Sequence, residues 1–112
     1  MINLAAGQCV ICRAGEPTLT DAEIEDLLLH VHEWQVKEVG GMKRLEKAFI
    51  FKNFAQALDF TNKIGAIAEE QDHHPLIILE WGKVTLNWWT HRIGGLHRND
   101  FIMAAKTDEL VT

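Results

Sequence analysis

Pro75 fixes where the longest predicted helix of this chain must end, and so it constrains the second half of the fold. Asn53 is a typical N-cap residue, and apolar side chains recur at helical spacing from Phe54 onward. A proline cannot continue a helix, and it favours extended backbone at the preceding residue, His74. The pattern therefore predicts a helix that begins after Asn53 and ends near Gln71, followed by extended chain.

Glycines separate two pairs of short segments that alternate in polarity or are rich in apolar residues. Gly40-Gly41 suits a tight hairpin turn, because glycine adopts positive φ at little steric cost. Gly82 separates the second pair in the same way. The segments predict four strands, arranged as two hairpins, at residues 34–39, 45–51, 76–81 and 83–91.

Two further helices complete the predicted fold. Thr20, with Glu23 three residues later, forms a capping-box pattern that predicts a helix over residues 21–32. A last helix begins at Asn99 or Asp100 and runs toward the C-terminus. The element order is α-β-β-α-β-β-α. We therefore expect an α+β fold with a four-stranded, mainly antiparallel sheet and three helices on one face.

Length and charge limit the classes of protein to which the chain can belong. A length of 112 residues predicts a single domain, which we place at 20–112. The segment 1–19, which contains Gly15-Glu16-Pro17, is predicted to be an irregular leader. The formal charge of −5 disfavours a nucleic-acid partner, because such binding relies on Lys and Arg. No apolar run approaches the roughly 20 residues that span a bilayer, and the N-terminus lacks a secretory pattern. We predict a cytoplasmic protein with no membrane partner.

The side chains of the last predicted strand alternate between two faces of the sheet. One set of side chains is expected to face the helices: those of Val84, Leu86, Trp88 and Thr90. The residues expected on the uncovered face or at its rim are Thr85, Asn87, Trp89 and His91. His91 is therefore expected beside a large aromatic surface, which suits a flat polar ligand.

Histidines and carboxylates are concentrated in one stretch of the sequence. His73 and His74 follow the end of a predicted helix, where exposed carbonyls and the nearby Asp72 favour a protonated imidazole. His91, next to Trp89, is expected in drier surroundings that favour the neutral ring. An acid and a base on opposite sides of a pocket suit the addition or elimination of water. The residues alone leave open whether His73 or His74 is the acid.

A metal site is the alternative use of the same side chains. Cys9 and Cys12 form a C-x-x-C pair in the leader, outside the β-α-β setting of a redox motif, and we interpret them as reduced thiols. They could also supply half of a zinc site, completed by His73, His74 and His91. Adjacent histidines rarely both face one ion, so we predict no metal.

A wider pattern joins these residues: Glu69, three residues, His73-His74-Pro75, five residues, Trp81, nine residues, His91, eight residues and Asp100. It resembles the signature of the pterin-4a-carbinolamine dehydratases. The predicted element order is similar to that family's fold over about residues 20–110. The cysteine pair and the segments 51–54 and 95–100 resemble the bacterial members that accompany phenylalanine hydroxylase.

The resemblance implies an activity, site roles and partners. The activity is dehydration of 4a-hydroxytetrahydrobiopterin, or a related pterin, to the quinonoid dihydropterin, which recycles the cofactor of aromatic amino-acid hydroxylases. The family implies acid–base work by His73 and His91 and substrate binding or orientation by His74. The other residues implied to line, brace or approach the pocket are Asp72, Thr90, Asp100 and Trp34. The family implies no cofactor, and a homodimer or homotetramer. Because some members also act as dimerisation cofactors for transcription factors, a protein-binding module is the alternative function.

Overall fold

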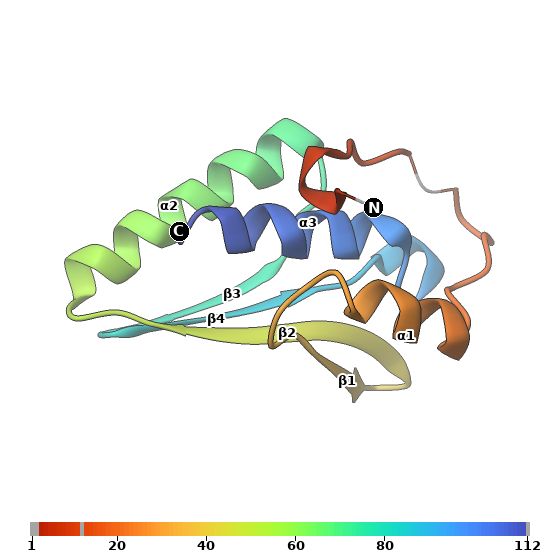
Figure 1. The fold of residues 1–112 in the computed structure, drawn as a ribbon, viewed down its shortest axis with the longest axis horizontal. Helices are drawn as coiled ribbons and strands as arrows, with labels where there is room; N and C mark the ends of the chain where they lie inside the picture. The colour runs from red at the N-terminus through yellow and green to blue at the C-terminus, as the bar shows by residue number, and fades with distance from the viewer. Residues whose placement is uncertain (1–2, 12, 112) are drawn as a thin grey trace.

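One antiparallel sheet carries all three α-helices on the same face (Figure 1). The computed structural model describes residues 3–11 and 13–111. The helices are η1 (Leu4–Ala6), α1 (Asp21–Leu28), α2 (Phe54–Gln71), η2 (His91–Ile93) and α3 (Arg98–Glu109), where η denotes a 3-10 turn. The strands are β1 (Gln35–Val39), β2 (Met42–Ile50), β3 (Leu76–Glu80) and β4 (Lys83–Trp88). They lie in the order β1-β2-β4-β3, which confirms the predicted α+β fold.

The first hairpin turns within two glycines. Gly40 and Gly41 have φ of 60° and 80°, so Val39 pairs directly with Met42. Strand β2 therefore begins three residues earlier than predicted. At the second hairpin, a Cβ on Gly82 would lie 2.9 Å from the carbonyl oxygen of Phe51, a contact that only glycine avoids.

Helix α1 begins where predicted and ends earlier. Thr20 and Glu23 form the reciprocal capping box. The helix ends at Leu28, because the following amides bond to carbonyls three residues back, as Val31 does to Leu28 at 3.3 Å. Glu33, with φ of 63°, then redirects the chain into β1.

Charged side chains link the start of α1 to the sheet. Nζ of Lys43 on β2 lies 2.5 Å from Oδ1 of Asp21. This hydrogen bond and the ammonium charge lower the pKa of the Asp21 carboxyl, and the same bond raises the pKa of Lys43. Within the capping box, the hydrogen bond from the backbone N–H of Thr20 lowers the pKa of Glu23.

The core lies between the sheet and helices α2 and α3. The buried apolar residues that the sheet contributes include Leu45, Phe49, Val84, Leu86 and Trp88. Those of the two helices include Ala57, Phe60, Ile64, Phe101, Met103 and Ala104. Within the part of the chain that is described, no helix is long and apolar enough to cross a membrane.

Strand β4 stops at Trp88, so the prediction that it reaches residue 91 was wrong. The N–H of Thr90 donates to the carbonyl of Gly95 at 2.9 Å, and Gly94 turns the chain with φ of 70°. This local loop replaces further pairing with the sheet and ends the strand. His91 consequently lies on the short turn η2.

The face predicted to be uncovered is partly covered by side chains. Asn87 and Trp89 are buried, contrary to the prediction. Trp89 is buried because two side chains cover its ring. Cζ of Arg44 lies 3.9 Å from the ring centre, and the ring of His91 packs against it with a centroid separation of 4.5 Å. The expectation that His91 lies beside an aromatic surface is confirmed. The drier surroundings predicted for it are not found, because His91 on η2 is exposed.

Candidate active site

The end of α2 sets the directions of His73 and His74. Asp72 caps the helix in the left-handed conformation, with φ of 51°, and its N–H bonds to carbonyls of the last turn. The N–H of His73 donates to the carbonyl of Ala68 at 3.1 Å. Pro75 then keeps the chain extended into β3. The two histidines therefore leave the helix on a sharp, hydrogen-bonded turn.

The side chain of His73 is held on two sides. Its ring stacks on Trp88 with an interplanar angle of 8° and a centroid separation of 5.8 Å. Its Nε2 lies 2.6 Å from Oδ1 of Asp100. Only 12% of the His73 side chain is exposed, whereas 55% of the His74 side chain is exposed. His73 is thus the fixed imidazole and His74 the accessible one, with its Nε2 2.5 Å from Oε2 of Glu69.

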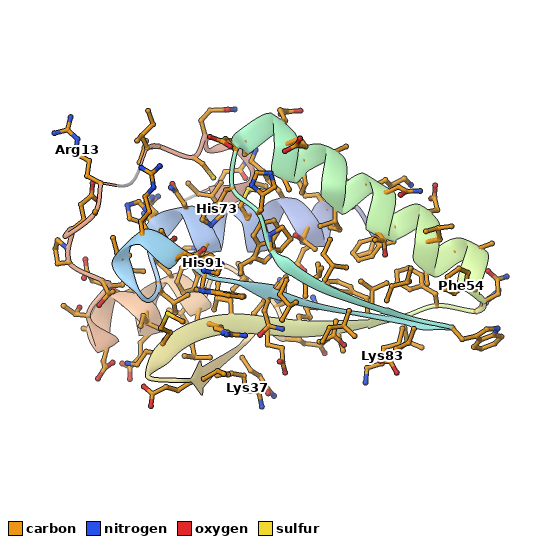
Figure 2. The ribbon with its side chains drawn as sticks, turned by 180° about the vertical axis from the view of Figure 1, so that it is seen from behind. Arg13, Lys37, Phe54, His73, Lys83 and His91 are labelled. Atoms are coloured by element: carbon orange, nitrogen blue, oxygen red, sulfur yellow. The ribbon has the colours of Figure 1, made fainter. Side chains whose placement is uncertain are left out.

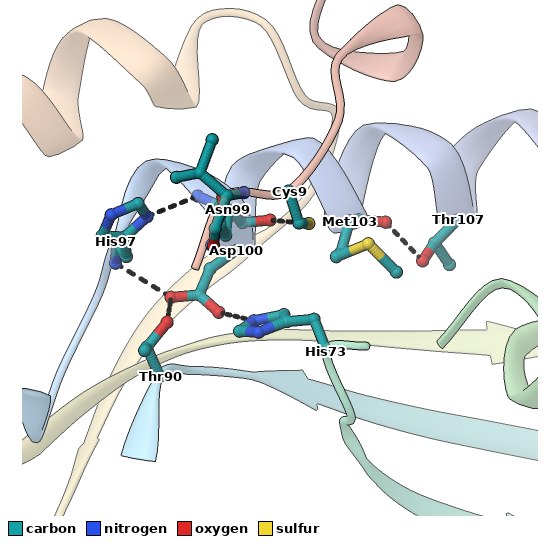
Figure 3. Close-up of polar contacts among 9 residues, drawn as sticks. Cys9, His73, Thr90, His97, Asn99, Asp100, Met103 and Thr107 are labelled. Atoms are coloured by element: carbon teal, nitrogen blue, oxygen red, sulfur yellow. Dashed lines mark hydrogen bonds and ion pairs between the residues drawn. The ribbon is translucent and has the colours of Figure 1, made fainter. Parts of the chain in front are cut away.

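Asp100 gathers donors from three different segments (Figure 3). Its Oδ2 accepts from the hydroxyl of Thr90 at 2.9 Å and from the backbone N–H of His97 at 2.9 Å. The bond from His97 closes a capping box, in which the ring Nδ1 of His97 accepts from the N–H of Asn99 at 3.0 Å. We predicted Asn99 or Asp100 as the first residue of this helix, but His97 is its N-cap.

The predicted catalytic histidines lie around one cleft of about 410 Å³. His73 and His74 line it from the end of α2, and His91 from η2. Figure 2 shows His73 and His91 at the same end of the sheet, far from Phe54 and Lys83 at the other end. The fold therefore brings His91 close to His73 and His74, although they are well separated in the sequence.

The remaining predicted residues divide into three groups. Asp72 and Thr90 line the cleft. Asp100 is fully buried behind it and contacts His73. Trp34 is not among the described residues that line the cleft; its indole N–H donates to the carboxylate of Asp108 at 3.1 Å. The role of Trp34 in substrate binding stays a prediction.

Sequence reasoning missed several residues of the cleft, which are Cys9, Val10, Ile11, Gln71, Arg92 and Asn99. The C-x-x-C pair was the only local signal in the leader, and it did not indicate where the leader lies. Cys9 contacts the carbonyl of Asn99 through Sγ at 3.9 Å. Cys12 lies outside the described residues, as does any zinc site that would need it.

Comparisons with known proteins point in one direction. Residues 17–110 match the sequence profile of the family described as "Pterin 4 alpha carbinolamine dehydratase". A protein of Marinobacter nauticus named "Putative pterin-4-alpha-carbinolamine dehydratase" is 57% identical over 110 residues, which cover 98% of this chain and 99% of that protein. A protein of the same name from Syntrophotalea carbinolica is 50% identical over 111 residues, covering 99% of each.

Solved structures show the same architecture. A crystal structure described as a transcriptional coactivator/pterin dehydratase from Brucella melitensis has a TM-score of 0.77 and 29% identity, and the match covers 85% of this chain and 99% of that one. A pterin dehydratase-like protein described as a RuBisCO assembly factor in the α-carboxysome has a TM-score of 0.61 and 28% identity, over 70% of this chain and 89% of that one.

Proposed function

We propose that this chain, which belongs to the pterin-4α-carbinolamine dehydratase family of hydro-lyases, removes water from 4a-hydroxytetrahydrobiopterin or a related 4a-hydroxytetrahydropterin. The observation that carries the proposal is the single cleft that His73, His74 and His91 line together. Its volume of about 410 Å³ suits a small bicyclic substrate, since small-molecule sites typically have roughly 300–1,000 Å³.

The reaction needs two proton transfers on adjacent substrate atoms. One group removes the proton of N5, and the N5 electron pair forms a double bond to C4a. A second group protonates the hydroxyl on C4a as the carbon–oxygen bond breaks, so that water leaves. The products are the quinonoid dihydropterin and one water molecule. Each positioned transfer typically contributes about 10²–10⁴-fold to the rate.

The environment of His73 supports its part in these transfers. The contact between Nε2 of His73 and Oδ1 of Asp100 occupies this ring nitrogen and holds the imidazole in one orientation. The other ring nitrogen, Nδ1, is then the one that exchanges a proton with the substrate. His91, on the separate turn η2, makes the second transfer. His74, which is more exposed and contacts Glu69, binds and orients the pterin.

The proposal extends to the setting in which the enzyme works. A cytoplasmic homodimer or homotetramer would recycle the pterin cofactor of an aromatic amino-acid hydroxylase. Apolar side chains exposed on β2 and β3, among them Ile50 and Ile78, are compatible with burial in such an oligomer. Light scattering on the purified protein measures the oligomeric state directly.

A hydroxylase-coupled assay tests the activity. An aromatic amino-acid hydroxylase generates the 4a-hydroxypterin, and the rate of its dehydration is followed with and without this protein. We expect clear acceleration by the wild type and a loss of about 10²–10⁴-fold in kcat for His91→Ala and for His73→Ala. His30→Ala, at an exposed histidine away from the cleft, should keep the full rate. A wild-type rate equal to that in buffer would contradict the proposal.

A further inference from the structure

We propose that residues 9–11 of the leader form one wall of the substrate cleft, and that Asn99 and Gln71 are positioning residues that hold this wall in place. The inference rests on the proposed function and adds a substrate-binding element to it. The segment lies before residue 17, where the family match begins.

The side chain of Asn99 holds the leader through two hydrogen bonds to the backbone of Val10, accepting one and donating the other. Its Oδ1 accepts from the N–H of Val10 at 3.0 Å, and its Nδ2 donates to the carbonyl of Val10 at 2.7 Å. Asn99 is buried at the first turn of α3, next to Asp100. An amide is the side-chain group that offers an acceptor and a donor in this arrangement, whereas a carboxylate only accepts.

Gln71 holds the neighbouring residues of the leader. This last residue of α2 accepts from the N–H of Cys9 through Oε1 at 2.9 Å. Its Nε2 donates to Oε1 of Gln8 at 3.0 Å. The leader therefore joins the end of α2, which His73 follows by two residues, to the start of α3, which carries Asp100. Figure 3 shows Cys9 beside Asn99, above the contact between His73 and Asp100.

A separate anchor holds the beginning of the leader on α3. Leu4 is buried in the core, and Nζ of Lys106 donates to the carbonyl of Ala5 at 2.8 Å. The contacts of Asn99 and Gln71 are thus not needed to keep η1 attached. Their effect is confined to the part of the leader that faces the histidines.

Two side chains on this wall, those of Val10 and Ile11, are apolar and open to solvent. Val10 is 62% exposed and Ile11 is 85% exposed, although both line the cleft with the catalytic histidines. Hydrogen bonds to Asn99 hold the backbone at Val10. Within the described chain, no residue buries the side chains of Val10 and Ile11. A bound pterin would cover them, so they contribute to substrate affinity and take no part in proton transfer.

Steady-state kinetics on matched variants test the wall. Asn99→Ala and Gln71→Ala should each raise KM by about three- to tenfold, the range expected for about one net hydrogen bond, and leave kcat unchanged. Asn99→Asp should also raise KM, because it cannot donate to the carbonyl of Val10. Gln56→Ala changes the same residue type near the start of α2, outside the cleft, and should keep the wild-type KM.

A second variant avoids any dependence on folding of α3. Val10→Ala combined with Ile11→Ala alters only exposed side chains, so we expect an unchanged melting temperature and a raised KM. The dissociation constant for 7,8-dihydrobiopterin, measured by calorimetry, should rise in parallel. If the wild type is active but KM and Kd are unchanged in this double variant and in Asn99→Ala, the proposed role of the leader is wrong and the proposed function still stands. A wild type that neither binds nor converts pterin would overturn the proposed function and the inference together.

Discussion

Nε2 of His73 lies 2.6 Å from Oδ1 of Asp100, a carboxylate that is fully buried at the first turn of α3. The second oxygen of the same carboxylate is occupied by Thr90 and by the backbone of His97. The carboxylate therefore links the imidazole, the end of the sheet and the helix N-terminus. Changes at Asp100 should affect both catalysis and folding.

Asp100→Asn should lower kcat by about tenfold or more and destabilise the fold. An amide has one acceptor oxygen for three donors, and a buried donor without a partner costs about 1–3 kcal/mol, where 1.36 kcal/mol is tenfold in rate. The measurements are kcat and the free energy of unfolding in urea. Thr107→Val, which removes another buried hydrogen bond on α3, to the carbonyl of Met103, should destabilise without lowering kcat. An active Asp100→Asn enzyme would argue against a role for this contact.

Substitutions at Asp72 should separate folding from activity. Because Asp72 is left-handed with φ of 51°, Asp72→Ala should lower the free energy of unfolding by about 1 kcal/mol, whereas Asp72→Gly should not lower it. Both variants remove the carboxylate from the cleft, so both should lose activity to the same extent. Urea unfolding and the hydroxylase-coupled rate give the two values. If Asp72→Gly instead kept its activity and only Asp72→Ala lost it, the backbone turn at residue 72 would matter for activity and the carboxylate would not.

The fold was predictable because its strongest signals are local. Thr20 with Glu23, Gly40-Gly41 and Pro75 each act within a few residues of their own position, and each set an element boundary as expected. The end of β4 was not predictable in this way. It depends on the bond between Thr90 and Gly95, which competes with pairing along the sheet.

The site was predictable only in part. The motif indicated the histidines, and the fold brings them to one cleft. The leader wall depends on contacts such as Cys9 with Gln71, which are 62 residues apart, and no local pattern encodes such a pairing. The protein-binding alternative stays a prediction, because it concerns a partner that the chain alone does not identify.

Trp34 and Asp108 allow a test of the substrate role that the family resemblance implies for Trp34. The indole N–H donates to Asp108, which also accepts from Nζ of Lys47 at 2.8 Å. Trp34→Phe removes the donor of this bond and Asp108→Leu removes its acceptor, so each variant should lose about 1 kcal/mol of stability or more. We expect KM to rise only for Trp34→Phe. An equal KM in the two variants would assign Trp34 a purely structural role.

Acid should weaken the attachment of α1. The folded-state pKa values of Asp21 and Glu23 lie below their ordinary values of 3.8 and 4.5. Their contribution to stability is therefore complete above those values and is lost as the pH falls through the lower, folded-state pKa values. Urea unfolding of Asp21→Asn/Glu23→Gln should differ from the wild type at neutral pH and converge with it in acid. A constant difference across that range would contradict this assignment.

The raised pKa of Lys43 acts at the opposite end of the pH scale. Its contribution is complete below the ordinary value of 10.5 and is lost as the pH rises through the higher, folded-state value. Lys43→Met should therefore approach the wild-type stability only in strong alkali, in the same urea experiment.

A single carboxylate closes the capping box of α3 and seats the imidazole of His73. Fraying of that first helical turn and loss of catalytic competence are therefore one event. On gradual warming, turnover should fail before the ellipticity of the helices declines, and the hydrogen-bonded amides of His97, Asn99 and Asp100 should exchange with deuterium at the rate of inactivation.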